Sequence, residues 1–171
     1  VEAGSLALVL KVAELVLLAR SHSRRRQERA REDSPRSPGR VALVADDSPV
    51  VRDVIAQALR AHGLQVLVAA DGEEALTLLR AQARVDVVVT DIKMEGLDGL
   101  GFLEEVKKIA PETEVVVITG FATMDTAKQS YQKGVFDFIA KPFSLSEIQQ
   151  VVKKAEAKAL QNRQAAQTKK G

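Results

Sequence analysis

The chain has 171 residues, of which 46% are hydrophobic, 28% charged and 4% aromatic, and its formal net charge is +2. This length suits one domain with extensions, and the apolar fraction is sufficient to bury a core. Because there is no cysteine and only two histidines, His22 and His62, the composition excludes a disulfide-stapled module and a cysteine nucleophile. It also argues against thiolate and histidine metal sites.

The first forty residues are basic and the rest of the chain is not. They carry nine Lys or Arg and five acids, whereas the remainder is slightly acidic. A weakly acidic globule does not favour direct nucleic-acid binding, which usually needs a concentrated basic face.

Residues 3–19 are a strongly apolar run with an arginine-rich stretch after it, so we expect a helix within 1–31. Its heptad-like Leu and Val spacing favours packing on a partner helix or on the globule. The alternative, which stays open, is membrane contact through an anchor. Against the anchor, the run is short, and Lys11 and Glu14 near its centre offset the gain from its nine Leu or Val residues.

Residues 32–39, rich in Ser and Pro, predict a linker. From Arg40 onward, short apolar stretches alternate with helical patterns. The expected strands cover 41–47, 64–70, 85–91, 113–120 and 135–140, and the expected helices begin at Ser48, Asp71, Asp98, Thr123 and Ser144, each a residue type that caps a helix. The first of these helices is expected to bury a face that includes Val51, Val54, Ile55, Ala58 and Leu59.

Five continuous apolar strands that alternate with helices are typical of a parallel sheet covered on both faces. We therefore predict an α/β fold, a flavodoxin-like, doubly wound domain with five parallel strands over 40–160. It carries the N-terminal helical extension over 1–31 and a polar tail over 161–171.

Three of the expected strands end in polar side chains. These are Asp46 and Asp47 in the first strand, Asp91 in the third and Thr119 in the fourth. The carboxyl ends of parallel strands share one edge of a sheet, where ligands bind. Helix capping accounts for Asp98, but it does not account for Asp91, which lies seven residues earlier.

Three carboxylates that crowd together require a cation or a raised pKa. Oxygen ligands without Cys or His indicate Mg²⁺. A carboxylate can also act as a nucleophile towards phosphorus, provided that a cation neutralises the phosphoryl oxygens. Lys141 follows the fifth strand, and a cis bond to Pro142 would direct its amine towards the same edge.

Residues 40–160 resemble the receiver domain of two-component response regulators. Five elements in order carry the resemblance: Asp46-Asp47, DIKMEGLDG over 91–99, VVVITG over 115–120, Phe138 and Lys141-Pro142. The segment over 119–143 is most similar to the receivers of bacterial enhancer-binding regulators. Glu95 is a departure, because the family usually has proline there.

The resemblance implies a role for each matching residue. Asp91 would accept a phosphoryl group from a sensor histidine kinase in a phosphorelay. Mg²⁺ would be held by Asp46, Asp47, Asp91 and the main-chain carbonyl of Lys93, whereas Lys141 and Thr119 would contact the phosphoryl group.

The resemblance also implies a switch. Phe138 would move inward as Thr119 moves, and this would change the surface formed by the helix over 123–133, the strand over 135–140 and the final helix. A homodimer through that surface is compatible with this hypothesis. The protein would be a cytoplasmic signalling phosphoprotein, membrane-associated if residues 3–19 are an anchor. It would not be an enzyme, because it catalyses only its own phosphorylation and dephosphorylation.

Other classes fit less well. A haloacid-dehalogenase-like phosphatase needs a second acid two residues after its nucleophile, where this chain has Lys93, and the GxxxxGK[ST] motif of a P-loop NTPase is absent. A flavodoxin-like electron carrier would need aromatic residues to stack a flavin. A receiver that only binds a partner is the main rival. The short segment after the last helix holds no output domain, so we expect a stand-alone receiver or a piece of a longer protein.

Overall fold

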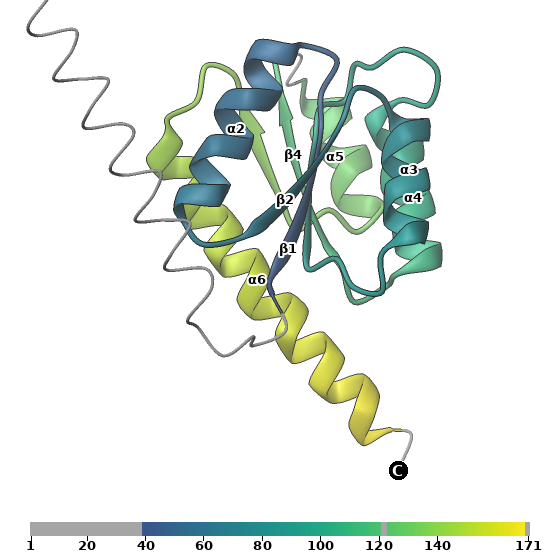
Figure 1. Ribbon diagram of the computed structural model, residues 1–171. Helices are drawn as coiled ribbons and strands as arrows, with labels where there is room; N and C mark the ends of the chain where they lie inside the picture. The colour runs from purple at the N-terminus through teal and green to yellow at the C-terminus, as the bar shows by residue number, and fades with distance from the viewer. Residues whose placement is uncertain (1–38, 121–122, 170–171) are drawn as a thin grey trace, which may run out of the picture. The chain divides into compact units, whose positions relative to one another are not determined.

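Strands and helices alternate along the part of the chain that the structure, a computed structural model, describes, which is residues 39–120 and 123–169 (Figure 1). The expected helix within 1–31 and nearly all of the linker lie outside these residues. The elements are β1 (Val41–Ala45), α2 (Pro49–Ala61), β2 (Gln65–Ala69), α3 (Gly72–Ala81), β3 (Val87–Thr90), α4 (Gly99–Ile109), β4 (Glu114–Thr119), α5 (Met124–Gln132), β5 (Asp137–Ala140) and α6 (Leu145–Thr168).

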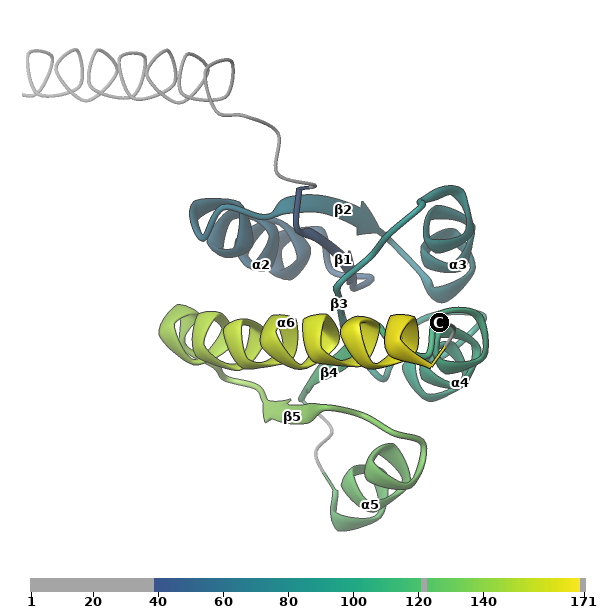
Figure 2. The same ribbon diagram turned by 90° about the horizontal axis from the view of Figure 1, so that it is seen from below.

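The five strands form one parallel sheet in the order β2-β1-β3-β4-β5. Helices α2 and α6 cover one face, and α3, α4 and α5 lie on the other (Figure 2). The predicted doubly wound α/β fold is therefore confirmed.

The central strands are apolar at consecutive positions because both of their sides are buried. In β1, Leu43 points into the core beneath α3 and α4, whereas its neighbours Ala42 and Val44 point into the core beneath α2 and α6. This arrangement explains why the expected strands show continuous rather than alternating hydrophobicity. Strand β2 lies at an edge of the sheet, and only Ala69 in it is buried.

Each helix begins directly after the residue at which the sequence predicted its start, and that residue is its cap. At α3, the Asp71 carboxylate accepts the Glu74 N–H at 2.8 Å, and the Glu74 carboxylate accepts the Ala70 N–H at 2.7 Å. One prediction about α2 is wrong, because Val54 is 39% exposed and Ala56 is buried in its place. The buried arc of the helix is centred on Ile55, so that Val54 falls just outside it.

Helix α6 continues beyond the expected domain end, so the predicted polar tail over 161–171 is helical as far as Thr168. Two of its side chains bind the edge of the sheet where β3 and β4 begin. The Asn162 amide donates to the Glu114 carboxylate at 2.7 Å, and the Arg163 guanidinium donates to the Val85 carbonyl at 2.6 Å and to the Asp86 carboxylate. The partners Val85, Asp86 and Glu114 lie just before β3 or at the start of β4. Their contacts explain why the polar C-terminal part of α6 remains part of the fold.

Asp86 is a buried carboxylate whose hydrogen bonds and ion pairs compensate for its burial. Burial alone would raise its pKa, but Arg84, the Val41 N–H and Arg163 together hold this pKa below the ordinary value. The ionised form is therefore the one that the fold stabilises.

Glu156 of α6 is a buried carboxylate whose charge is compensated only in part. Arg40 and His62 lie 3.5 and 3.7 Å from its oxygens, but neither Glu156 oxygen has a hydrogen-bond partner among the described residues. Burial raises the pKa of Glu156, and Arg40 and His62 oppose this only in part, while Asp86 adds to it. The ionised form is disfavoured in the fold.

Glu156→Gln should therefore stabilise the protein at neutral pH. A carboxyl whose pKa is raised by folding contributes its stability below about pH 4.3 and loses it as the pH rises through the folded pKa. We expect a gain on the order of 1 kcal/mol in the free energy of unfolding at pH 7, because glutamine removes a buried charge that Arg40 and His62 compensate only in part. The gain should shrink towards pH 4.

Urea unfolding followed by circular dichroism between pH 4 and pH 8 measures this difference. Glu73→Gln, which changes an exposed acid on α3, is the control and should show little pH-dependent effect. A loss of stability in Glu156→Gln at pH 7 would contradict the prediction.

Candidate functional site

The carboxyl ends of β1, β3, β4 and β5 bring the predicted site residues to one edge of the sheet. Ala45 pairs with Thr90, so that Asp46 and Asp91 are the next residues on neighbouring strands, and the Asp91 N–H donates to the Ala45 carbonyl at 3.0 Å. Thr119 pairs with Ala140. Register alone therefore places residues that are distant in sequence beside each other.

Three carboxylates meet at this edge. One oxygen each of Asp46, Asp47 and Asp91 lies within 4.8 Å of the others. Asp46 is buried, Asp91 is 7% exposed, and Asp47 is exposed to solvent. The site is thus a partly buried acidic cluster that is open on the side of Asp47.

Lys141 provides the positive charge that faces the buried carboxylates. Its ammonium lies 2.8 Å from Asp91 Oδ2 and 3.2 Å from Asp46 Oδ2. The Lys141 N–H donates to the Thr119 carbonyl at 2.9 Å, and the Lys141-Pro142 peptide bond is cis. Lys141 directly follows β5, the edge strand, and its side chain reaches across to the ends of β3 and β1.

The pKa values of these groups reflect burial and mutual attraction. Burial raises the pKa of Asp46, and this outweighs the Ser48 N–H and Lys141, which lower it, while Asp91 raises it further. Burial lowers the pKa of Lys141, but Asp91 and Asp46 more than compensate and raise it above its ordinary value. The Lys141 amine therefore stays protonated. The positive charge near Asp46 does not fully offset the effect of burial on its pKa.

Main-chain groups fix the second oxygen of each buried carboxylate. Asp46 Oδ1 accepts the Ser48 N–H at 2.9 Å, and Asp91 Oδ1 accepts the Lys93 N–H at 3.2 Å. The Lys93 side chain is exposed. The assignment of its main-chain carbonyl as a metal ligand stays a prediction.

Two residues at the site were not predicted as functional. Gly99 opens α4 so close to Asp91 that a Cβ there would stand 2.0 Å from the Asp91 carbonyl oxygen, so only glycine fits. The Arg52 guanidinium of α2 donates to the Asp46 carbonyl at 2.7 Å. The DG pair was recognised only as a helix start, and a single arginine in a helix carries no motif.

Thr119 ends β4, and Phe138 lies in the neighbouring strand β5. Thr119 is fully buried at the end of β4. Phe138 is partly buried in β5 and packs against the core beneath α3 and α4. Movement of either side chain stays a prediction.

The donor set of the cluster fits Mg²⁺. All its side-chain ligands are carboxylate oxygens, which hard divalent cations prefer. Three carboxylates face one ammonium group among the described residues, so a divalent cation would balance the remaining charge.

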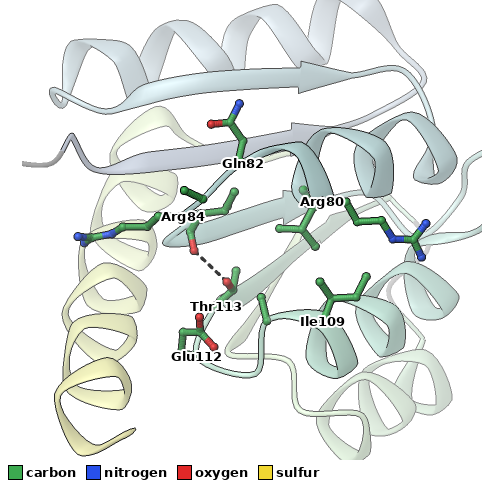
Figure 3. Close-up of a pocket in the computed structure, with 10 residues that line it drawn as sticks. Arg80, Gln82, Arg84, Ile109, Glu112 and Thr113 are labelled. Atoms are coloured by element: carbon green, nitrogen blue, oxygen red, sulfur yellow. Dashed lines mark hydrogen bonds between the residues drawn. The ribbon is translucent and has the colours of Figure 1, made fainter. Parts of the chain in front are cut away.

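A hollow of about 240 Å³ lies elsewhere, between the segments that precede β3 and β4 (Figure 3). Thr113 donates to the Val85 carbonyl at 2.8 Å on its wall, and the charged ends of Arg80 and Arg84 point away from it. These residues precede the strands, so the hollow is at the edge of the sheet opposite the acidic cluster and contributes nothing to it.

Comparison with known proteins identifies relatives of the same kind. The model of the response regulator receiver domain family matches residues 42–153. The DNA-binding transcriptional regulator NtrC of Salmonella typhimurium is 36% identical over 115 residues, which are 67% of this chain and 24% of that protein. The putative response regulator NtrX-like of Rickettsia bellii is 37% identical over 115 residues, or 66% of this chain and 24% of that protein.

Solved structures agree with this result. The receiver domain of NtrX from Brucella abortus is 36% identical with a TM-score of 0.64, covering 68% of this chain and 98% of that one. A response regulator receiver domain protein from Clostridium thermocellum is 31% identical with a TM-score of 0.66, covering 69% of this chain and 94% of that one. The chain spans 24% of the length of the curated relatives named above, whose remaining parts have no counterpart in this match.

Mg²⁺ should raise the thermal stability of the chain, and Asp47→Asn should remove most of that gain. A ligand that binds only the folded state stabilises it by about 1.4 kcal/mol when its concentration is ten times its Kd. Removing one ligand weakens binding, although the lower charge of the cluster should itself stabilise the metal-free variant. Calorimetric melts with and without Mg²⁺ measure both effects.

Asp53→Asn is the control, because it neutralises an exposed acid on α2 that is not part of the cluster. It should keep the full Mg²⁺ effect. An equal Mg²⁺ effect in Asp47→Asn and in the unmodified chain would show that the cation binds elsewhere.

Proposed function

The chain belongs to the response regulator receiver domain family, and from this premise we propose that it accepts a phosphoryl group on Asp91 from a sensor histidine kinase. The observation that carries the proposal is the convergence of Asp91, two further carboxylates and the Lys141 ammonium at one edge of the sheet. A carboxylate with only a structural role does not need two further carboxylates and an ammonium group beside it.

The reaction that we propose is a displacement at phosphorus. A carboxylate oxygen of Asp91 forms the new O–P bond, the bond between phosphorus and the donor nitrogen breaks, and the imidazole leaves with the electron pair. Lys141, 2.8 Å from Asp91, pairs with the negative phosphoryl oxygens. Bound Mg²⁺, held by Asp46, Asp47, Asp91 and the Lys93 carbonyl, would supply further neutralisation of that charge.

The phosphorylated state is proposed to be transient and to be formed and hydrolysed by the chain itself, without an enzymatic activity on other substrates. Gly120 follows Thr119, and a Cβ there would make only ordinary contacts with Lys141, at 3.9 Å or more. Because Gly120 has no side chain, nothing at this position keeps water from the phosphoryl group.

Phosphorylation is proposed to change the surface formed by α5, β5 and α6, through which the chain contacts its partner. Met124 is 89% exposed, Tyr131 55% and Leu145 47%, so this surface presents apolar groups to a partner or to a second copy of the chain. We propose no direct nucleic-acid binding by the receiver, and that it acts in the cytoplasm. Membrane contact concerns residues 1–31, which are not described; within the described residues, no helix is long and apolar enough to cross a bilayer.

Asp91→Asn should abolish phosphorylation by acetyl phosphate in the presence of Mg²⁺. The amide keeps the shape of the side chain but removes the nucleophilic oxygen. Intact-mass spectrometry measures the phosphorylated fraction, which should also vanish for the unmodified chain when a chelator removes the metal. Glu95→Gln, an exposed acid in the loop after Asp91, should react like the unmodified chain.

Equal phosphorylation of Asp91→Asn would show that another residue accepts the group. No phosphorylation of the unmodified chain with either a small donor or a kinase would favour the rival function, a receiver that only binds its partner.

Beryllofluoride, a phosphoryl mimic, should change amide chemical shifts in α5, β5 and the start of α6. An anion at Asp91 offers the Thr119 hydroxyl a charge-assisted hydrogen bond, and the space that Thr119 leaves admits more of the Phe138 ring. Burying the exposed part of a phenylalanine contributes up to about 1.5–3 kcal/mol, which is sufficient to bias a two-state equilibrium. Thr119→Val should keep the changes near Asp91 and lose the distant ones. Changes confined to the loops around Asp91 in the unmodified chain would contradict the switch.

A further inference from the structure

Arg52 contacts the acidic cluster through the main chain. It lies on α2 and is partly buried, and its Nη1 donates to the Asp46 carbonyl oxygen at 2.7 Å. We propose that Arg52 is a positioning residue, which fixes the peptide between Asp46 and Asp47 and thereby directs the Asp47 carboxylate towards the metal. This proposal rests on the proposed function, because it concerns the same site.

The Asp47 side chain has no support of its own. Among the described residues it makes no hydrogen bond or ion pair, and it is exposed. Asp46, in contrast, is held at Oδ1 by the Ser48 N–H and at Oδ2 by Lys141. The direction of the Asp47 carboxylate therefore depends on the orientation of its main chain.

The Asp46 carbonyl belongs to the peptide that leads into Asp47. The Asp46 N–H donates to the Ala69 carbonyl at 3.3 Å, so the preceding peptide is held by β2. The hydrogen bond from Arg52 to the Asp46 carbonyl holds the next peptide, between Asp46 and Asp47. Rotation of that peptide would turn the Asp47 side chain, and a guanidinium that binds the carbonyl opposes this rotation.

The main chain that carries Arg52 is itself held in place by the first turn of α2. The Arg52 main-chain N–H donates to the Ser48 carbonyl at 3.0 Å in the first turn of α2, and Ser48 caps that helix. The segment from Asp46 to Ser48 is thus held by α2 in two ways, through the Arg52 side chain and through the Ser48 cap. Outer contacts that orient metal ligands typically change metal affinity 10- to 100-fold.

Charge and positioning predict opposite effects of removing Arg52. A cation beside a cation site repels the metal, so loss of its charge alone should strengthen Mg²⁺ binding. Loss of a positioning contact should weaken it. The sign of the change therefore distinguishes the two roles.

The test measures Mg²⁺ affinity by isothermal titration calorimetry on the full chain and on Arg52→Ala, Arg52→Lys and Arg60→Ala. Arg60 is the matched control: it is an exposed arginine on the same helix, and its side chain makes no hydrogen bond or ion pair with the described residues. We expect about tenfold weaker binding in Arg52→Ala, a smaller loss in Arg52→Lys, and unchanged or slightly stronger binding in Arg60→Ala.

A second measurement uses the metal-free protein. The amide signals of Asp47 and Ser48 should move and exchange faster with solvent in Arg52→Ala but not in Arg60→Ala. Phosphorylation of Arg52→Ala by acetyl phosphate should be slow at low Mg²⁺ and approach that of the unmodified chain at saturating Mg²⁺, because the nucleophile is intact.

Mg²⁺ binding that is unchanged or stronger in Arg52→Ala would overturn the proposal, as would metal-free amide signals that do not move. If Arg52→Ala fails to fold, Arg52→Lys carries the test, and equal affinity with unchanged signals in that variant would also overturn it. If the unmodified chain binds no Mg²⁺, the proposed function fails, whereas the metal-free amide signals still test whether Arg52 holds the loop.

Discussion

The attraction between Lys141 and the two buried carboxylates is the interaction on which the site depends. Asp46 and Asp91 lie where ionised acids repel each other and lose hydration, and the ammonium at 2.8 and 3.2 Å compensates for both effects in part. The compensation is incomplete, since burial still raises the pKa of Asp46. The structure therefore holds a cluster that gains from any further positive charge, and this is the property that a metal-dependent phosphoacceptor requires.

The parallel sheet is what makes this cluster possible. The acids and Thr119 lie at the ends of β1, β3 and β4, which are buried on both faces, so the main chain there is held by the core and not by the site. Lys141 follows an edge strand, whereas the acids follow central strands. These residues are far apart in sequence, and they meet only because the carboxyl ends of parallel strands lie at the same edge of the sheet. The start of α4 approaches the main chain of Asp91 so closely that only glycine fits at position 99.

Most of the fold could be predicted because its rules are local. Continuous apolar runs and capping residues such as Ser48 and Asp71 gave the elements, and the carboxyl-edge rule brought Asp46, Asp91 and Lys141 together. The rest depends on contacts between distant residues. The last turns of α6 looked like a polar tail, since Arg163 finds its partner Asp86 only in the folded chain. The contact of Arg52 with the Asp46 carbonyl could not be predicted either. Every residue has a main-chain carbonyl, so the sequence does not indicate which one an arginine binds.

Two buried aspartates at opposite ends of the sheet, Asp86 and Asp46, differ in how far their charge is compensated. At the amino end, Asp86 receives donors from Arg84, Arg163 and the Val41 N–H, and its pKa falls below the ordinary value. At the carboxyl end, Asp46 has one ammonium to share with Asp91, and its pKa rises. A fold selected only for stability would satisfy both acids in the same manner, because uncompensated buried charge is costly. Departures of this kind concentrate at functional sites. A raised pKa alone does not mark the site in this chain, because burial also raises the pKa of Glu156. What distinguishes Asp46 is that two further carboxylates and the Lys141 ammonium lie beside it at the carboxyl end of the sheet.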